Sequence, residues 1–262
     1  MGTIKTHLQA LKDEGKKAFI PYVTYGYPTI EKSLAVVRAL DEAGSSLIEI
    51  GLPFSDPVAD GPVIQAASVE ALKHGVNLDR CVADFSAIKK DLNAPLAIMT
   101  YYNLLFGYGL EKFFKKIKGT FDGIIIPDIL PDDADELRSL AEKYGIGVTF
   151  FVAPTTQAKR LSLIDKASTS FVYYVSVTGT TGARMTFDKK TFSEIAAVGK
   201  KMKTPVCAGF GIATREHVKA FEKVCDGVIV GSAIIKKITE CAQSDDMPKQ
   251  VAAFARSLMG KD

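Results

Sequence analysis

Residues 18–52 of the chain read AFIPYVTYGYPTIEKSLAVVRALDEAGSSLIEIGL. Residues 18–24 (AFIPYVT) and 47–52 (LIEIGL) are almost continuously apolar, which is typical of parallel strands buried on both faces. The amphipathic residues 31–42 between them are followed by Gly44, and they are long enough for a crossover helix. This stretch therefore predicts one unit of strand, helix and parallel strand.

The same alternation continues to the end of the chain. Further apolar runs, each expected to be a strand, occupy residues 95–101, 123–127, 147–152, 171–177, 205–210 and 227–230. Helical patterns lie between and after them, in a stretch ending at 71 and at 79–90, 110–118, 132–144, 157–167, 189–202, 214–224, 233–241 and 248–259. Eight such units in 262 residues predict an α/β fold with a single (β/α)8 barrel domain over residues 1–262. The alternative is a doubly wound open sheet, which normally has fewer strands; the chain also lacks a G-x-G-x-x-G after its first strand.

Composition excludes several classes of protein. With 47% hydrophobic and 24% charged residues, the chain resembles ordinary globular domains and not disordered ones. The net charge of +3 is spread along the chain, which favours neither a nucleic-acid partner nor a membrane surface. No apolar run is long enough to cross a bilayer, and the first residues, MGTIKTHLQALKDEGKK, lack the apolar core of a signal peptide.

The cysteines and histidines point away from a metal site. The four cysteines show no C-x-x-C spacing, and the three histidines are far apart in the sequence. We therefore expect no metal and a reduced, cytoplasmic setting.

Glu49 is the first polar residue that a barrel core would not select. It lies among apolar residues near the end of the second expected strand, and alternation places it on the same face as Leu47 and Gly51. If that face points into the barrel mouth, where chemistry occurs in this fold, desolvation should raise the pKa of Glu49 toward neutrality. The structural alternative is a glutamate paired with a buried lysine or a backbone amide.

The loop that follows carries two further acids. Residues 53–62 contain three prolines and Gly61, which stiffen the loop and prevent a helix. Asp56 and Asp60 on this loop are either turn or helix-capping residues or part of a site. Glu49 and Asp60 together would place two carboxylates in one barrel mouth.

Glycine, serine and threonine follow the last three expected strands, at residues 176–182, 208–212 and 230–233. Backbone N–H groups in such turns, and a helix that starts at Ser232, suit an anion such as phosphate. In the sixth expected strand, one of Tyr173 and Tyr174 should face the barrel interior and the other the helices.

These residues match a known family. The segment LIEIGLPFSDPVADGPVIQ at residues 47–65, GTTGA at 179–183, GFGI at 209–212 and VGSAI at 230–234 occur in the expected order. Over nearly its whole length the chain resembles the α subunit of tryptophan synthase. The resemblance implies a lyase of tryptophan biosynthesis, and hence of aromatic amino-acid biosynthesis, that cleaves indole-3-glycerol phosphate to indole and glyceraldehyde 3-phosphate by a retro-aldol reaction.

The resemblance also implies a role for each matching residue. Glu49 would protonate indole C3 and take the proton of the glycerol C3′ hydroxyl, and Asp60 would accept the indole N–H and stabilise the positive indolenine. Tyr173 would lie near the glycerol chain, and Thr181 on a mobile loop would contact Asp60. The phosphate would be bound by Gly182, Gly209, Phe210, Gly211, Gly231 and Ser232, and the indole wall would include Tyr22, Met99 and Ile125.

The implied partner is a β subunit in an α2β2 heterotetramer. Pyridoxal phosphate is expected only in that subunit, and no cofactor is expected in this chain. The chain departs from the family pattern at Tyr22, where phenylalanine is frequent, at Arg184 and Met185 after Gly182, and at Leu130, where proline is usual. Two other functions fit parts of the pattern: a different phosphate-binding barrel, such as a ribulose-phosphate isomerase or epimerase, and a non-catalytic subunit that only activates a β partner.

Overall fold

The computed structural model describes residues 3–175, 189–209 and 211–261. Within these residues, eight parallel strands form one closed barrel: β1 (Ala18–Thr24), β2 (Ile48–Gly51), β3 (Leu96–Met99), β4 (Gly123–Ile125), β5 (Gly147–Val152), β6 (Val172–Val175), β7 (Val206–Gly209) and β8 (Gly227–Val230). The predicted (β/α)8 barrel is thus confirmed.

The strands pair in chain order and the ring closes between its two ends. Tyr22 of β1 is the register partner of Glu49 of β2, and on its other side β1 pairs with β8, Ala18 opposite Gly227. An open sheet has two edge strands, whereas each of the eight strands here has a partner on both sides. This closure excludes the doubly wound alternative.

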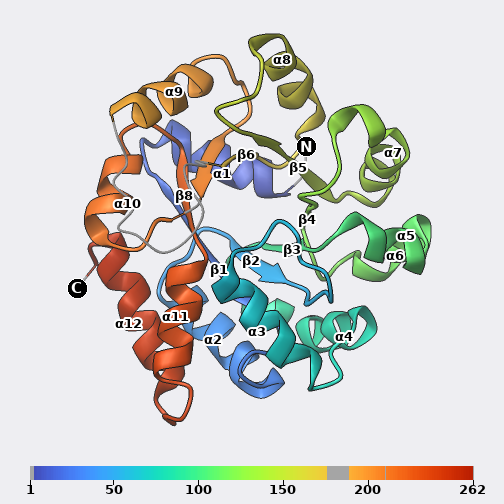
Figure 1. Ribbon diagram of the computed structural model, residues 1–262, viewed down its shortest axis with the longest axis vertical. Coiled ribbons are helices and arrows are strands. Elements are labelled where there is room, and N and C mark those ends of the chain that lie inside the picture. The colour runs from blue at the N-terminus through green and yellow to red at the C-terminus, as the bar shows by residue number, and fades with distance from the viewer. Residues whose placement is uncertain (1–2, 176–188, 210, 262) are drawn as a thin grey trace.

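The described helices surround the ring of strands, except that α1 lies across one end of it (Figure 1). They are α1 (Thr3–Asp13), α2 (Ile30–Glu42), α3 (Pro62–Leu72), α4 (Leu78–Ile88), α5 (Tyr102–Tyr108), α6 (Leu110–Ile117), α7 (Asp135–Tyr144), α8 (Ala158–Ala167), α9 (Lys189–Gly199), α10 (Arg215–Phe221), α11 (Ser232–Glu240) and α12 (Met247–Met259), with short 3₁₀ turns at Lys89–Asp91 and Pro131–Asp133. Side chains cap several starts; Thr29, for example, accepts a hydrogen bond from the Lys32 N–H at the start of α2. None of the helices described is long and apolar enough to cross a membrane.

Two helices and several helix boundaries differ from the sequence pattern. α1 lies at the amino-terminal end of the barrel, where Ile4 reaches Gly123 at the start of β4, and α5 follows β3 directly. Neither was expected, because both lie outside the regular alternation of strand and helix. The expected helix 132–144 begins at Asp135, since Pro131–Asp133 forms a separate 3₁₀ turn.

Two acidic residues at the amino-terminal end of the barrel accept backbone hydrogen bonds and form ion pairs. Asp122 accepts the Leu96 N–H of β3 at 2.8 Å and pairs with Lys89. Asp226 accepts the Val206 N–H of β7 at 2.9 Å and pairs with Lys12 at 3.0 Å. These carboxylates hold strand starts in register, and they contrast with the acids at the other end.

Candidate active site at the barrel mouth

Glu49 faces the barrel interior from β2. It is only 3% exposed, and its Oε2 has no hydrogen-bond partner among the described residues. Burial raises its pKa to about 8, and the charge of Asp60 adds to the rise. Within the described part of the chain no lysine or arginine pairs with it, so the structural alternative of a buried ion pair does not hold there. The expected rise in pKa is present, and burial is its first cause.

Asp60 is held over the same mouth by the loop between β2 and α3. Its Oδ2 accepts a hydrogen bond from the Tyr101 hydroxyl at 2.8 Å, and that hydroxyl oxygen accepts the Ala59 N–H at 3.1 Å. The Tyr101 ring stacks on Phe54 at 5.4 Å between centroids. Burial raises the pKa of Asp60 to about 6, against the opposing effect of the Tyr101 hydrogen bond. The loop is thus tied to β3 through one phenol.

The other acid of the loop is not part of this arrangement. Asp56 is exposed, and its backbone carbonyl accepts the Val58 N–H. The residue that caps α3 is Gly61, without a side-chain hydrogen bond, and Pro62 begins the helix. Neither Asp56 nor Asp60 is therefore the cap of α3, and of the two it is the charge of Asp60 that raises the pKa of Glu49.

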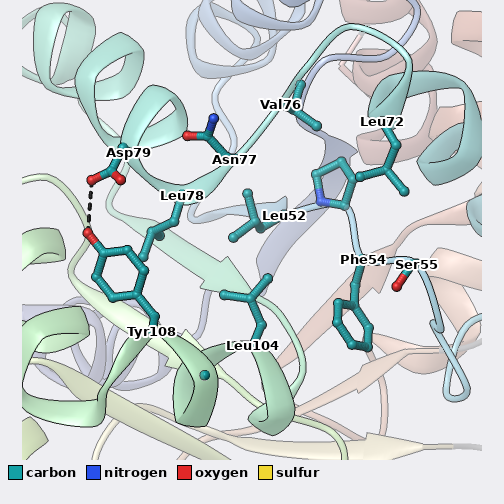
Figure 2. Close-up of a pocket in the computed structure, with 12 residues that line it drawn as sticks. Leu52, Phe54, Ser55, Leu72, Val76, Asn77, Leu78, Asp79, Leu104 and Tyr108 are labelled. Atoms are coloured by element: carbon teal, nitrogen blue, oxygen red, sulfur yellow. Dashed lines mark hydrogen bonds between the residues drawn. The ribbon is translucent and has the colours of Figure 1, made fainter.

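The far side of the same loop lines a separate cavity of about 480 Å³ (Figure 2). Leu52 and Phe54 face Leu78 and Leu104 there, while Tyr108 is anchored to Asp79 by a 2.8 Å hydrogen bond. This cavity lies between the loop, α4 and α5, and neither Glu49 nor Asp60 lines it. The loop that carries Asp60 therefore has the barrel mouth on one side and an apolar hollow on the other.

Two phenols, Tyr22 of β1 and Tyr173 of β6, interact with the two carboxylates. The Tyr22 side chain covers Gly51, where a Cβ atom would lie 1.9 Å from the Tyr22 oxygen. Tyr173 covers Gly209 in the same manner, with the Cβ 2.5 Å from its oxygen. Burial first, and then the charges of Glu49 and Asp60, raise the pKa of Tyr173, so both phenols stay neutral.

The neighbouring wall is apolar, and the alternation in β6 is as expected. Met99 and Ile125 are buried register partners on β3 and β4. Tyr173 stacks on Phe151 at 4.9 Å and faces the interior, while Tyr174 turns outward to the side of Glu194 in α9.

The described parts of two glycine-rich turns follow β7 and β8, at the same end of the barrel. Gly211 has φ +73°, a left-handed conformation that favours glycine, and Gly231 precedes Ser232, the first residue of α11. A Cβ on Gly231 would contact Ile64 and Tyr22, so this turn adjoins the Tyr22 ring. The first N–H groups of α11 are free of helix partners by position, as an anion site requires.

Some of the predicted residues lie outside the described residues: Thr181, Gly182, Arg184, Met185 and Phe210. One residue of the arrangement was missed. Tyr101 was assigned to the expected strand 95–101, but β3 ends at Met99. Its signal was a phenol directly after an apolar run, at the end of the barrel where polar side chains have a use.

Comparison with known proteins agrees with this geometry. Residues 8–260 match the family model described as tryptophan synthase alpha chain. The chain belongs to the tryptophan synthase alpha chain family. A tryptophan synthase alpha chain of Thermoanaerobacter sp. (strain X514) is 40% identical over 259 residues, 98% of each chain. One from Carboxydothermus hydrogenoformans is 42% identical over 234 residues, 89% of this chain and 88% of the relative.

The fold agrees as well as the sequence. The crystal structure of the tryptophan synthase alpha chain from Legionella pneumophila subsp. pneumophila superposes with a TM-score of 0.90 at 30% identity, and the match covers 100% of this chain and 97% of that one. Membership of the tryptophan synthase alpha chain family separates this chain from the isomerase and epimerase barrels that the phosphate turns alone would permit.

Proposed function

We propose that this chain is a lyase that cleaves indole-3-glycerol phosphate to indole and glyceraldehyde 3-phosphate, in tryptophan biosynthesis. One observation carries the proposal: two carboxylates share the barrel mouth, and their pKa values differ, about 8 for Glu49 and about 6 for Asp60. Near pH 7 the first is protonated and the second is ionised. The site thus offers an acid and an anion at the same time, which is what a cleavage without a metal or Schiff base requires.

The protonated Glu49 donates its proton to indole C3. The positive charge that develops on the indole nitrogen is stabilised by Asp60, which accepts the N–H. The carboxylate of Glu49 then takes the proton of the C3′ hydroxyl. The C3–C3′ bond breaks, its electron pair returns to the indole ring, and the oxygen electrons form the aldehyde. Glu49 ends protonated, so the cycle needs no external acid.

The remaining predicted residues bind and orient. The turns at Gly209, Gly211, Gly231 and Ser232, with Gly182 and Phe210, are assigned to the phosphate, whose binding holds the reacting bond over Glu49. Tyr173 is assigned to the glycerol chain and Thr181 to closure over Asp60. Tyr22, Met99 and Ile125 are assigned to the indole wall; their buried, inward positions support this.

The proposed partner is a β subunit in an α2β2 tetramer, and pyridoxal phosphate is assigned to that subunit alone. Three large apolar side chains are exposed on the segments that follow β2, β3 and β4: Val58, in the loop before α3, is 70% exposed, Phe106, in α5, 69%, and Leu130, in the loop after β4, 59%. Exposed apolar side chains gathered on one face are typical of a protein interface. We also propose the cytoplasm as the setting; the four thiols are free and buried.

The test of the reaction is indole release from indole-3-glycerol phosphate by the purified chain, with and without a β subunit. Glu49→Gln is expected to lose nearly all cleavage while the far-ultraviolet circular dichroism stays native. Glu142→Gln, on an exposed face of α7, is the matched control and keeps wild-type turnover. Near wild-type turnover by the Glu49 variant would refute the assignment. A wild-type chain that only activates the β subunit and never releases indole would support the regulatory alternative.

The test of the partner face is sedimentation with a β subunit. Leu130→Asp is expected to weaken the complex, whereas Leu163→Asp, at a partly exposed position of α8, is not. Equal affinities for the two variants would place the interface elsewhere.

A further inference from the structure

The Tyr22 side chain is buried inside the barrel, in the part that carries the two carboxylates. Tyr22 is 4% exposed, and the charges of Asp60 and Glu49 both act on its phenol. Its oxygen lies against Gly51, which is the next inward-facing residue after Glu49 on β2. Tyr22 and Glu49 are also register partners on adjacent strands. A phenylalanine at this position would have the same ring and no hydrogen-bonding group.

The hydrogen bonding of this hydroxyl is incomplete on the donor side. Thr24, which is fully buried, donates its hydroxyl proton to the Tyr22 oxygen over a long 3.5 Å. The oxygen is therefore an acceptor in this pair, and among the described residues no acceptor is recorded for the Tyr22 proton itself. A phenol has one proton to donate, and a buried donor usually finds a partner.

Glu49, one of the two carboxylates that act on this phenol, has the complementary deficit. Glu49 Oε2 is buried and has no donor among the described residues. In the structure these two groups do not bond. A protonated Glu49 tolerates the missing donor because it is neutral, but an ionised carboxylate that is buried without a donor is costly. When Glu49 ionises, the free proton of Tyr22 is the donor that the geometry supplies.

We propose that the Tyr22 hydroxyl donates a hydrogen bond to Glu49 whenever this carboxylate is ionised, and that Tyr22 is thereby a positioning residue for the acid–base group. The importance of this bond for cleavage rests on the proposed function; the bond itself does not. It holds the carboxylate toward the mouth at the moment when it must take the C3′ hydroxyl proton.

The other phenols of the mouth are less suited to this role. The Tyr101 proton is already donated to Asp60. Tyr173 acts on Glu49 from β6, where its ring is stacked on Phe151 and its oxygen lies over Gly209. The titratable groups that face Glu49 in the described residues are therefore Asp60, Tyr22 and Tyr173, while β3 and β4 present apolar side chains.

The test is a titration of Glu49 in the substrate-free chain. The protein is labelled with ¹³C at the glutamate side-chain carboxyl carbon, the Glu49 signal is assigned by its loss in Glu49→Gln, and its chemical shift is followed with pH. In Tyr22→Phe, which removes one oxygen and no ring atom, the apparent pKa of Glu49 is expected to rise by about one unit, since the ionised form loses a charge-assisted hydrogen bond.

The matched control is Tyr27→Phe. Tyr27 also bonds a hydroxyl, that of Thr239 at 2.8 Å, but it does so outside the mouth, and its removal should leave the Glu49 titration unchanged. An unchanged or lower Glu49 pKa in Tyr22→Phe would overturn the inference. The titration does not require turnover. If the Glu49 pKa rises in Tyr22→Phe but the wild-type chain does not cleave indole-3-glycerol phosphate, the proposed function is refuted and the Tyr22 contact is supported.

Discussion

Replacement of Glu49 by glutamine is expected to stabilise the folded chain at neutral pH, although it removes cleavage. The native state keeps the Glu49 proton up to about pH 8, whereas the unfolded chain releases it near the ordinary value of 4.5. Between these values the native state binds more protons than the unfolded state, so stability falls as pH rises through this window. Glutamine has a similar shape and does not ionise, so the stability of Glu49→Gln does not fall with pH for this reason.

The size of the effect follows from the two pKa values. Ionisation of Glu49 lowers the free energy of unfolding of wild type by about 1 kcal/mol at pH 5 and by about 3 kcal/mol at pH 7, at 1.36 kcal/mol for each unit of pKa. The free energy of unfolding of Glu49→Gln, relative to wild type, should therefore increase by about 2 kcal/mol between these two pH values. Guanidinium denaturation of both proteins at pH 5, 6 and 7, with equal slopes against denaturant, measures it.

Comparison across pH separates this effect from packing. A poorly satisfied glutamine amide would shift stability by the same amount at every pH, and Glu142→Gln on the surface should show no difference at any pH. If the gap between Glu49→Gln and wild type is constant from pH 5 to pH 7, Glu49 does not hold a proton in the native state, and the reasoning about its role as an acid is refuted.

Three further outcomes are expected from the same geometry. Asp60→Asn should slow cleavage by about 2–4 kcal/mol in activation free energy, measured as kcat/KM, because the developing positive charge loses its anion; a loss below threefold would contradict this. Wild-type kcat/KM should be highest between about pH 6 and pH 8, where Asp60 is ionised and Glu49 is protonated. Tyr101→Phe should move the acidic limb of this profile to higher pH, because the Tyr101 hydrogen bond lowers the pKa of Asp60. Gly51→Ala should lower the free energy of unfolding by about 1–3 kcal/mol, measured by thermal unfolding, because its Cβ would meet the Tyr22 oxygen. The double variant with Tyr22→Leu should recover most of this stability, and an additive loss would show that residue 51 and Tyr22 do not touch.

The barrel was predictable because its signal is repeated. Each strand is a short apolar run, each crossover has a helical period, and errors of one or two residues at a boundary do not change the count of units. Strands 18–24, 147–152 and 227–230 have the predicted bounds. α1 and α5 were not predictable in this way, since each stands outside the repeat: one lies at the amino-terminal end of the barrel, and the other immediately follows β3.

In the site, a residue could be predicted from the sequence where its chemical type differs from that of its sequence neighbours. Glu49 stands out because a carboxylate in an apolar strand demands an explanation, and Asp60 because a proline-rich loop follows that strand. The role of Tyr101 depends on where β3 ends and on which way the loop folds back, and no local pattern encodes either. The contact of Tyr22 with Gly51 likewise joins two strands across the register, which the sequence alone does not specify.

The two glycines under the phenols show how the interior accommodates its polar groups. β2 and β7 each carry a glycine at the inward position near the strand end, and each glycine lies beneath a tyrosine from a neighbouring strand: Gly51 beneath Tyr22 and Gly209 beneath Tyr173. A side chain at either position would displace a phenol, whose large ring fills the space that two smaller residues would otherwise share. Both phenols interact electrostatically with Glu49, and burial is the first cause of its raised pKa. The burial that makes Glu49 costly to ionise therefore also makes it able to donate a proton near pH 7.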